Sequence, residues 1–471
     1  GYGLDFRTQN YTRQSTVVNG QTVAYRAYEN IVYVANPADS AYQTINIYIP
    51  EAYFNGGSIN GYTAQTAPIF LPNQIGGYMP AEPGKPALEG KSGEPEDSQK
   101  SPNAALTALS KGYVVASPGA RGRTESTGKA PAAIVDLKAA VRYLKANDKA
   151  MPGDAEKIIS NGTSAGGAMS ALLGATADQK DYEKYLKALG AADGSDKVFA
   201  VSAYCPITDL DHADMAYEWQ FNGINDYKKM NISMLDYRVK RELVAGTLTD
   251  DEKKLSDLLK PLYPAYLNSL NLKSPEGKPL TLDAQGNGSF KNHIAGLLAQ
   301  SAQTQLDAGK NLSDRAWLNV RNGKVISVDF DAYAKAAGRQ KTPPAFDGVD
   351  LSAGENQLFG TNTVDKRHFT AFSMQHNTAA NAEIADEETI KIMNPLNYIG
   401  KPGVNLPQNW RIRVGTNDRD TSLAVSAVLA AKLQNNGQTV DYALPWDVEH
   451  GGDYDLDELF AWMKQVSSSA K

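Results

Sequence analysis

A serine surrounded by glycines, in the stretch NGTSAGG (161–167), is the residue whose setting best suits nucleophilic chemistry. Gly162, Ser164 and Gly166 fit the pattern G-x-S-x-G, which places a serine on a sharp turn between a strand and a helix. The apolar run KII precedes the turn, and the Ala-rich stretch AGGAMSALLGA follows it. Glycines leave space for neighbouring backbone, so the hydroxyl stays exposed. An ordinary Gly-rich turn is the alternative, but the flanking strand and helix favour a nucleophile.

A serine nucleophile also needs donors for the negative charge that develops on a carbonyl oxygen. The amide of Ala165 opens the predicted helix after the serine, and free N–H groups at a helix N-terminus favour an anion. A second donor usually comes from a glycine-bearing loop after an early strand. FLPNQIGGYMP (70–80) offers Gly76 and Gly77, of which we favour Gly77; a simple turn is the alternative.

A serine nucleophile needs a histidine as its general base and an acidic residue that orients this histidine, and the chain has only five histidines. His450 follows the strand-like run TVDYALPW in the loop DVEHGGDYD, whose glycines let the loop turn towards the serine. Asp418 and Asp420 follow the strand-like run NWRIRVG, and either of them could orient the imidazole or cap the helix expected from Ser422. The spacing does not choose between them. The remaining histidines lie in the middle of the chain and are expected to be polar or capping residues there: His212, His293, His368 and His376.

The stretches before and after the serine alternate between strand and helix patterns. The strand-like runs are 30–34, 43–50, 67–72, 112–119 and 197–207. Helical spacing of apolar residues marks 132–148, and an apolar strand then leads into the serine turn. Strands that alternate with helices predict a mostly parallel sheet.

The middle of the chain follows another pattern, because strand signals stop there and helical ones replace them. Thr249 and Glu252 form a capping-box pattern, and 294–306 carries an apolar stripe at helical spacing. Strand signals return at 409–415 and 439–446, with a helix at 422–435 between them. We expect an α/β core made of residues 1–209 and 397–471, interrupted by a large, mainly helical lid over residues 210–396.

Composition excludes several classes of protein. Hydrophobic residues make up 42% and charged residues 21%, as in ordinary globular proteins. With 47 Lys and Arg against 53 Asp and Glu, and no long basic run, we expect no nucleic-acid partner. No apolar stretch approaches the roughly 20 residues needed to cross a bilayer, so no membrane partner is expected either. Cys205 is the single cysteine, so no intramolecular disulfide can form. We expect a monomer that needs no metal or cofactor.

The first residue is Gly1, which favours a secreted protein whose leader has been removed over a cytoplasmic one. The compartment is otherwise left open.

Over nearly its whole length the chain resembles the bacterial tannases, which are tannin acyl hydrolases of the α/β-hydrolase superfamily. Long and unusual segments carry the resemblance: PNQIGGYMP, GARGRT, SNGTSAGGAMSAL, FAVSAYCPI, HADMAYEWQFNGIND, PAFD, RDTS and ALPWDVEHGGDYDL. The resemblance implies an α/β-hydrolase core with a lid. It also implies a triad of Ser164, Asp418 and His450, and so chooses the first aspartate.

The resemblance further implies that Lys341 and Glu355 of the lid, together with Asp420, hold the three galloyl hydroxyls. This makes physical sense, because adjacent phenolic hydroxyls both donate and accept, so two carboxylates and one ammonium can bracket them. Without the resemblance, Lys341 and Glu355 would be taken as solvated surface. Ile207, close to the end of a buried strand, is expected to line the acyl pocket.

Fungal tannases and related feruloyl esterases place linked cysteines beside the catalytic serine and histidine. Here the neighbours are Thr163 and Glu449, which places the chain with the bacterial branch. Cys205 is then a small buried apolar residue. For Arg121 and Arg123 a salt bridge that anchors their loop is favoured over a substrate contact.

These residues predict a serine esterase that hydrolyses galloyl esters of hydrolysable tannins and simple gallate esters, releasing gallic acid through an acyl-enzyme. One alternative keeps the triad but prefers feruloyl or other aryl esters, or peptide bonds. Another is a catalytically silent polyphenol-binding protein, against which the complete set of serine, aspartate, histidine and glycines argues. No motif identifies the leaving alcohol, whether glucose, catechin or an alkyl group.

Overall fold

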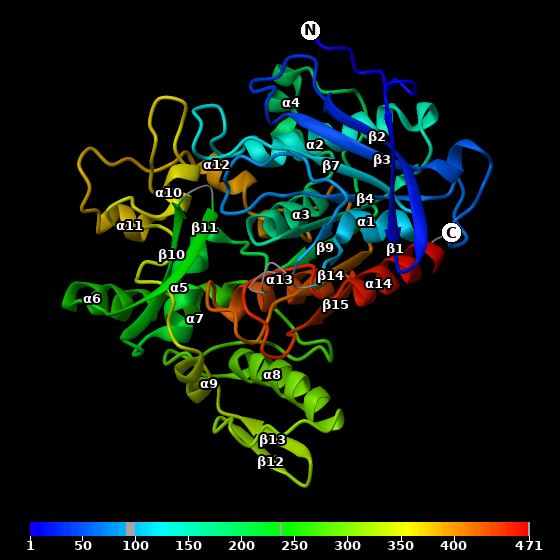
Figure 1. Ribbon diagram of the computed structural model, residues 1–471. Coiled ribbons are helices and arrows are strands. Elements are labelled where there is room, and N and C mark those ends of the chain that lie inside the picture. Colours follow the sequence, from blue (N-terminus) through cyan, green and yellow to red (C-terminus); the bar gives the residue numbers. More distant parts are fainter. Residues whose placement is uncertain (91–98, 236–237, 470–471) are drawn as a thin grey trace.

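A computed structural model describes residues 1–90, 99–235 and 238–469 of the chain. Within these residues nine strands form one central sheet (Figure 1). In sheet order they are β1 (Thr12–Val18), β2 (Gln21–Val32), β3 (Thr44–Pro50), β7 (Val114–Pro118), β4 (Pro68–Pro72), β8 (Asp154–Thr163), β9 (Ala200–Tyr204), β14 (Asn409–Arg413) and β15 (Thr439–Ala443). Neighbours are antiparallel from β1 to β7 and parallel from β7 to β15.

Helices cover this sheet on both faces. Strands β4, β7 and β9 are buried along their whole length, which explains their continuous apolar runs. Helix α2 packs against α3, and α1 against α14. The core helices are α1 (Ala104–Ser110), α2 (Ala132–Ala146), α3 (Ala165–Ala175), α4 (Glu183–Leu189), α13 (Leu423–Asn435) and α14 (Leu456–Ser469). The predicted α/β core with a mostly parallel sheet is therefore confirmed.

The chain between β9 and β14 forms an insertion, which we call the lid after the sequence prediction, and it lies beside and below the sheet in the view of Figure 1. Its helices are α5 (Leu210–Phe221), α6 (Asp250–Leu259), α7 (Leu262–Ser269), α8 (Ser289–Asp307), α9 (Phe330–Ala337), α10 (Gly354–Leu358), α11 (Ala371–Gln375) and α12 (Glu387–Ile392). The predicted capping box is present, since the amide of Glu252 donates to Thr249 Oγ1 and the amide of Thr249 donates to Glu252 Oε1. The lid is mainly helical, as predicted.

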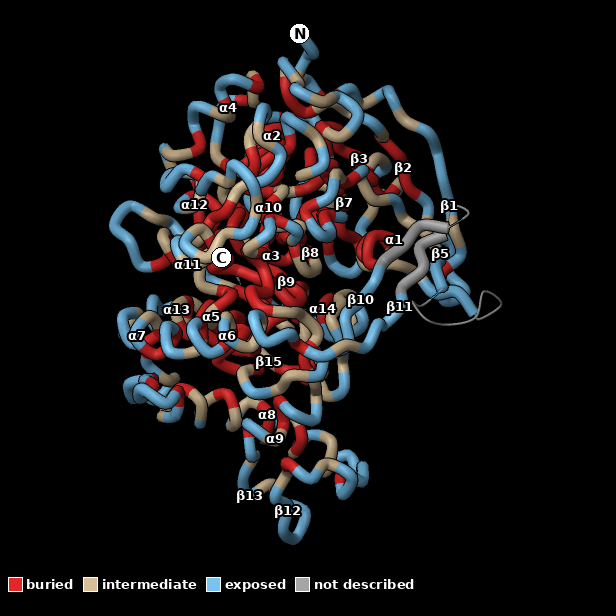
Figure 2. Tube along the Cα trace, turned by 90° about the vertical axis from the view of Figure 1, so that its left-hand side faces the viewer, coloured by how far each residue is buried: buried red, intermediate tan, exposed pale blue. Residues whose placement is uncertain are grey.

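The expectation that strands stop in the lid is wrong at two hairpins, β10 (Asp226–Leu235) with β11 (Arg238–Thr247), and β12 (Leu318–Arg321) with β13 (Lys324–Val328). These strands lie outside the central sheet, and those of the second hairpin are largely exposed, so they lack a long apolar run (Figure 2). The sequence did contain a signal for the second hairpin, because Asn-Gly is a dipeptide typical of hairpin turns. Asn322 and Gly323 lie at the turn of this hairpin, with φ of 53° and 73°.

Short elements complete the described chain: β5 (Leu88–Glu89), β6 (Ser101–Pro102), η1 (Glu51–Phe54), η2 (Asp148–Ala150), η3 (Lys180–Tyr182) and η4 (Pro395–Asn397). Among the residues that the structure describes, no helix has the length and apolarity to cross a membrane. Strands β8, β9, β14 and β15 are parallel, so their carboxyl ends meet at one edge of the sheet, and the candidate site lies there.

Candidate active site

Ser164 lies on the turn between the end of β8 and the start of α3, with φ of 60° and ψ of −121°. A side-chain-bearing residue at positive φ costs about 1–3 kcal/mol, and such strain gathers at functional sites. The two flanking glycines are required by space. A Cβ on Gly162 would lie 2.1 Å from Gly166 O, and one on Gly166 would lie 2.4 Å from Asn73 Oδ1. The pattern of the sequence is thus explained by atoms that approach closely on both sides of the serine, a backbone oxygen at Gly162 and a side-chain oxygen at Gly166.

Ser164, His450 and Asp418 form one chain of hydrogen bonds. His450 Nε2 lies 2.7 Å from Ser164 Oγ, and His450 Nδ1 lies 2.7 Å from Asp418 Oδ2. Asp418 is fully buried, and its Oδ1 accepts from the amide of Asp420. A buried carboxylate held in this way can fix the imidazole ring in one orientation, with Nε2 facing the hydroxyl.

The loop that carries His450 is held by polar groups that the sequence analysis missed. Asp455 accepts from both the Tyr204 hydroxyl and Arg411, each at 2.5 Å. Asn161 on β8 donates to Asp453 Oδ1 at 2.9 Å. Arg411, between the apolar residues Trp410 and Ile412 in β14, was a signal for this network, because a buried guanidinium requires a partner.

The electrostatic surroundings of His450 favour its charged form. Burial opposes the imidazolium, but the charge and hydrogen bond of Asp418, with smaller contributions from Cys205 and Asp420, raise the pKa of His450 well above its ordinary value. Cys205 Sγ lies 3.9 Å from His450 Nε2, and Asp420 Oδ2 lies 3.1 Å from the same nitrogen. Cys205 is buried, as expected, but it lies directly against the imidazole.

The two expected oxyanion donors lie on neighbouring segments. Ala165 is the first residue of α3. The loop with Gly77 packs against the first turn of that helix, since Asn73 Nδ2 donates to Gly166 O at 3.0 Å. Gly77 itself has φ of 56°, which glycine adopts without strain.

Lys341, Glu355 and Asp420, from three separate segments, lie close enough for their charges to act on each other. Burial raises the pKa of Glu355, the positive charges of Lys341 and Arg123 oppose that rise, and the charge of Asp420 adds to it. Lys341 Nζ lies 4.2 Å from the centre of the Phe346 ring. All three side chains are half-buried, so the view of Lys341 and Glu355 as solvated surface is wrong. Because these three residues are far apart in the sequence, no local pattern indicated that they lie close together.

The other expected residues have structural surroundings. Arg121 binds the buried Asp136 at 2.8 Å and the carbonyl of Thr127, so it anchors its loop as favoured. Ile207 is buried just beyond the end of β9. His368 contacts Asp347 at 2.7 Å, and His212 stacks on Tyr266. The last two are polar packing residues of the lid.

Two side-chain clusters in the described chain carry the donor types of a metal site: Cys205, Asp418 and His450, and Asp209, Asp211 and His212. In the first, a metal ion would displace the contacts of His450 with Ser164 and Asp418. In the second, Asp209 already accepts from Asn394 and Tyr266 and contacts His212. We therefore assign no metal to either cluster.

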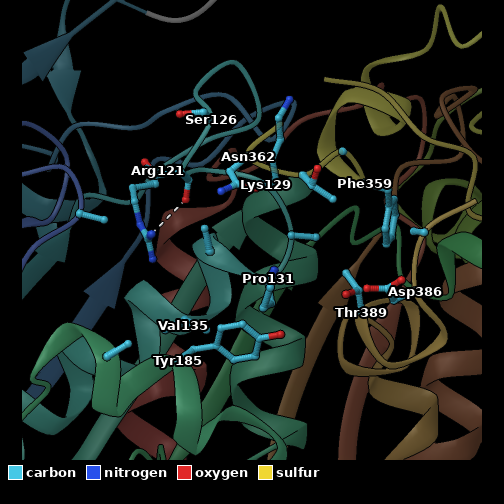
Figure 3. Close-up of a pocket in the computed structure, with 18 of the residues that line it drawn as sticks. Arg121, Ser126, Lys129, Pro131, Val135, Tyr185, Phe359, Asn362, Asp386 and Thr389 are labelled. Atoms are coloured by element: carbon cyan, nitrogen blue, oxygen red, sulfur yellow. Dashed lines mark hydrogen bonds between the residues drawn. The ribbon is translucent and has the colours of Figure 1, made fainter. Parts of the chain in front are cut away.

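A cavity of about 460 Å³ lies apart from Ser164, His450 and Asp418 (Figure 3). The loop of Arg121 and Lys129, helix α4 and lid residues around Phe359 line it, whereas no triad residue does. The chemistry is therefore sought at the serine and not in this cavity.

Comparisons with known proteins identify the family. The family model BD-FAE matches residues 90–248, and no curated protein matches the chain. The tannase of Fusobacterium nucleatum is 49% identical, with a TM-score of 0.93 over 99% of this chain and 100% of that one. The tannase of Lactobacillus plantarum is 44% identical, with a TM-score of 0.93 over 98% and 99% of the two chains.

A tannin acyl hydrolase solved in complex with ethyl gallate is also 44% identical, with a TM-score of 0.90 over 98% of this chain and 99% of that one. The similarity extends over nearly the whole chain, so it includes the core, the lid and the segments that carry the candidate site. The chain belongs to the bacterial tannase family of α/β-hydrolases.

Proposed function

We propose that this protein is a tannase: a serine esterase that hydrolyses galloyl esters and releases gallic acid. The observation that carries the proposal is the hydrogen-bond chain from Ser164 through His450 to the buried Asp418, with both contacts at 2.7 Å. Membership of the tannase family, and the ethyl gallate bound to one similar enzyme, support the galloyl group as the acyl portion of the substrate.

In the proposed mechanism, Ser164 Oγ attacks the ester carbonyl while His450 Nε2 accepts its proton. Asp418 stabilises the imidazolium that forms, and the amides of Ala165 and Gly77 donate to the oxyanion. When the tetrahedral intermediate collapses, the ester C–O bond breaks and His450 returns the proton to the leaving alcohol. Water then attacks the acyl-enzyme by the same steps, which frees gallic acid and regenerates the Ser164 hydroxyl.

The galloyl ring is bound by Lys341, Glu355 and Asp420 in this proposal, with Ile207 against the ring. Carboxylates accept from phenolic hydroxyls, and the Lys341 ammonium donates to one. A benzoate ester would leave these groups desolvated and unpaired, so discrimination against it is expected on the order of 10⁴-fold. A ferulate ester replaces one hydroxyl by a methoxy group, and its longer linker displaces the carbonyl from Ser164.

The experiment is the release of acid from methyl gallate, beside methyl ferulate and methyl benzoate, at matched concentrations. Faster release from methyl gallate by several orders of magnitude is expected. A preference for methyl ferulate would favour the feruloyl esterase alternative. Gallate binding without turnover, and without labelling of Ser164 by a fluorophosphonate, would favour a binding protein.

A further inference from the structure

Arg123 joins the core loop that contains Gly77 to the lid helix that contains Glu355. Its Nε donates to Gly77 O at 2.7 Å, and its Nη1 donates to Gln357 Oε1 at 2.6 Å. Gln357 and Glu355 both belong to the short helix α10. One planar guanidinium, with donors in a rigid fork, therefore links two segments more than 270 residues apart in the sequence.

The backbone of Arg123 is itself fixed. Its amide donates to Tyr78 O at 2.8 Å. Its carbonyl accepts from Lys129 Nζ at 2.7 Å, and the same ammonium donates to Gln357 O and to Asp365 Oδ1 at 3.1 and 2.7 Å. Lys129 is 7% exposed and lines the neighbouring cavity in Figure 3. Hydrogen bonds thus hold the backbone of Arg123 in place as well as its guanidinium.

The guanidinium also packs against the start of α10. A Cβ built on Gly354 would lie 3.1 Å from Arg123 Cζ, so a glycine here allows the close approach. Burial raises the pKa of Glu355, the residue after Gly354, and the charge of Arg123 is one of the influences that oppose this rise. Arg123 therefore acts on Glu355 both through the position of its helix and through charge.

The geometry of a galloyl ester makes such a link matter. Its ring and carbonyl are conjugated and nearly coplanar, so the distance from the ring hydroxyls to the carbonyl carbon is fixed. The ring site and the oxyanion donors must then lie at one matching separation, and misplacement by about 1 Å can cost on the order of 10²-fold in rate. An unsubstituted benzoyl group, which lacks the hydroxyls, is not held at both ends.

We propose that Arg123 is a positioning residue that sets the separation between the Gly77 oxyanion loop and the Glu355 helix, so that a bound galloyl ring presents its carbonyl to Ser164. This inference rests on the proposed function. Arg123 touches neither the reacting atoms nor the ring; it acts through Gly77 and through α10.

The test is a double-mutant cycle between Arg123→Met and Glu355→Gln, measured on methyl gallate and on methyl benzoate. Arg123→Met is expected to lower kcat/KM for methyl gallate on the order of 10²-fold and for methyl benzoate about tenfold or less. In the Glu355→Gln background the excess loss on methyl gallate should vanish, because the ring is no longer held at that end. Wild-type gallate release tests the proposed function separately.

Arg123→Lys keeps the charge but lacks a fork that reaches both acceptors. It should therefore also lower kcat/KM for methyl gallate more than for methyl benzoate, but by a smaller factor than Arg123→Met, because its ammonium can still reach one of the two acceptors. Arg26→Met is the matched control, since Arg26 also binds with two nitrogens, to Glu51 at 3.0 and 3.1 Å, far from the site. It should leave both ester activities unchanged.

Losses by Arg123→Met that are equal on the two esters, or an excess loss on methyl gallate that persists in the Glu355→Gln background, would overturn the proposal. So would wild-type kinetics in Arg123→Met. If Arg123→Met does not fold, as judged by its thermal transition, the same cycle with Arg123→Lys decides the matter by the same criterion.

Discussion

Asp420 and Asp418 contact opposite nitrogens of His450. Asp418 Oδ2 lies 2.7 Å from Nδ1, whereas Asp420 Oδ2 lies 3.1 Å from Nε2, the nitrogen that also contacts Ser164. A carboxylate at Nδ1 can orient the ring without blocking the serine. One at Nε2 adds negative charge where a proton must arrive, and it lies within reach of an acyl group at the serine. Two aspartates only two residues apart thus face the imidazole from different sides.

The position of Asp420 predicts a change in pH dependence. Since the general base must be neutral and the pKa of His450 is raised, partly by the charge of Asp420, activity should fall as the pH falls through that raised value. Asp420→Asn removes a negative charge, lowers the pKa of His450, and should move the acid limb of the kcat/KM profile to lower pH. Methyl benzoate is the substrate to use, because it makes no galloyl contacts.

Asp386→Asn is the control for this profile, because that exposed carboxylate lies at the start of α12, outside the site. Its acid limb should coincide with that of the wild type. An unmoved limb in Asp420→Asn would show that its charge does not act on His450.

Ser164→Ala deletes one oxygen at the turn and should reduce turnover of every ester by about 10³-fold or more, with fold and ligand binding retained. Rates of gallate release and the thermal transition measure the two effects. In the wild type, a fluorophosphonate should label Ser164 alone, as mapped by mass spectrometry of peptides. Labelling at another serine would contradict the assignment of the nucleophile.

The galloyl contacts predict acyl-group selectivity. Lys341→Met and Glu355→Gln should each cost about 1–3 kcal/mol in kcat/KM for methyl gallate and leave methyl benzoate nearly unchanged, because only the galloyl ring has hydroxyls to lose as partners. Kinetics on the two esters give the comparison directly. Equal loss on both would instead assign these residues to folding or to the position of the lid.

The Arg411–Asp455 pair predicts an effect on both stability and rate. Asp455→Ala removes the carboxylate that pairs with the buried Arg411 and should destabilise the fold. Because Asp455 also holds the His450 loop, kcat should fall as well. Denaturant unfolding and methyl gallate kinetics measure the two effects.

The double variant Arg411→Met, Asp455→Leu removes both charges. It should recover much of the stability without recovering kcat, since the loop still lacks its anchor. Full recovery of both would show that the pair has no role in placing His450.

Local features of this protein followed from the sequence alone. The turn around Ser164, the capping box of Thr249 and the helix over 294–306 each depend on residues within a few positions of one another. Steric limits at glycine, side-chain capping and helical periodicity act over that range, so the residue types carry the answer. The second hairpin of the lid could have been predicted in the same way, from Asn322–Gly323.

Contacts between distant segments were decided only by the tertiary structure. Ser164 and His450 are 286 residues apart, and which aspartate faces which nitrogen of that imidazole depends on how β14 and β15 extend the sheet beside β9. The Arg123 link and the Arg411–Asp455 pair likewise join segments whose approach no local pattern encodes. A hydrogen bond needs its two atoms within about 3 Å, and for residues this far apart only the packing of the whole chain sets that distance.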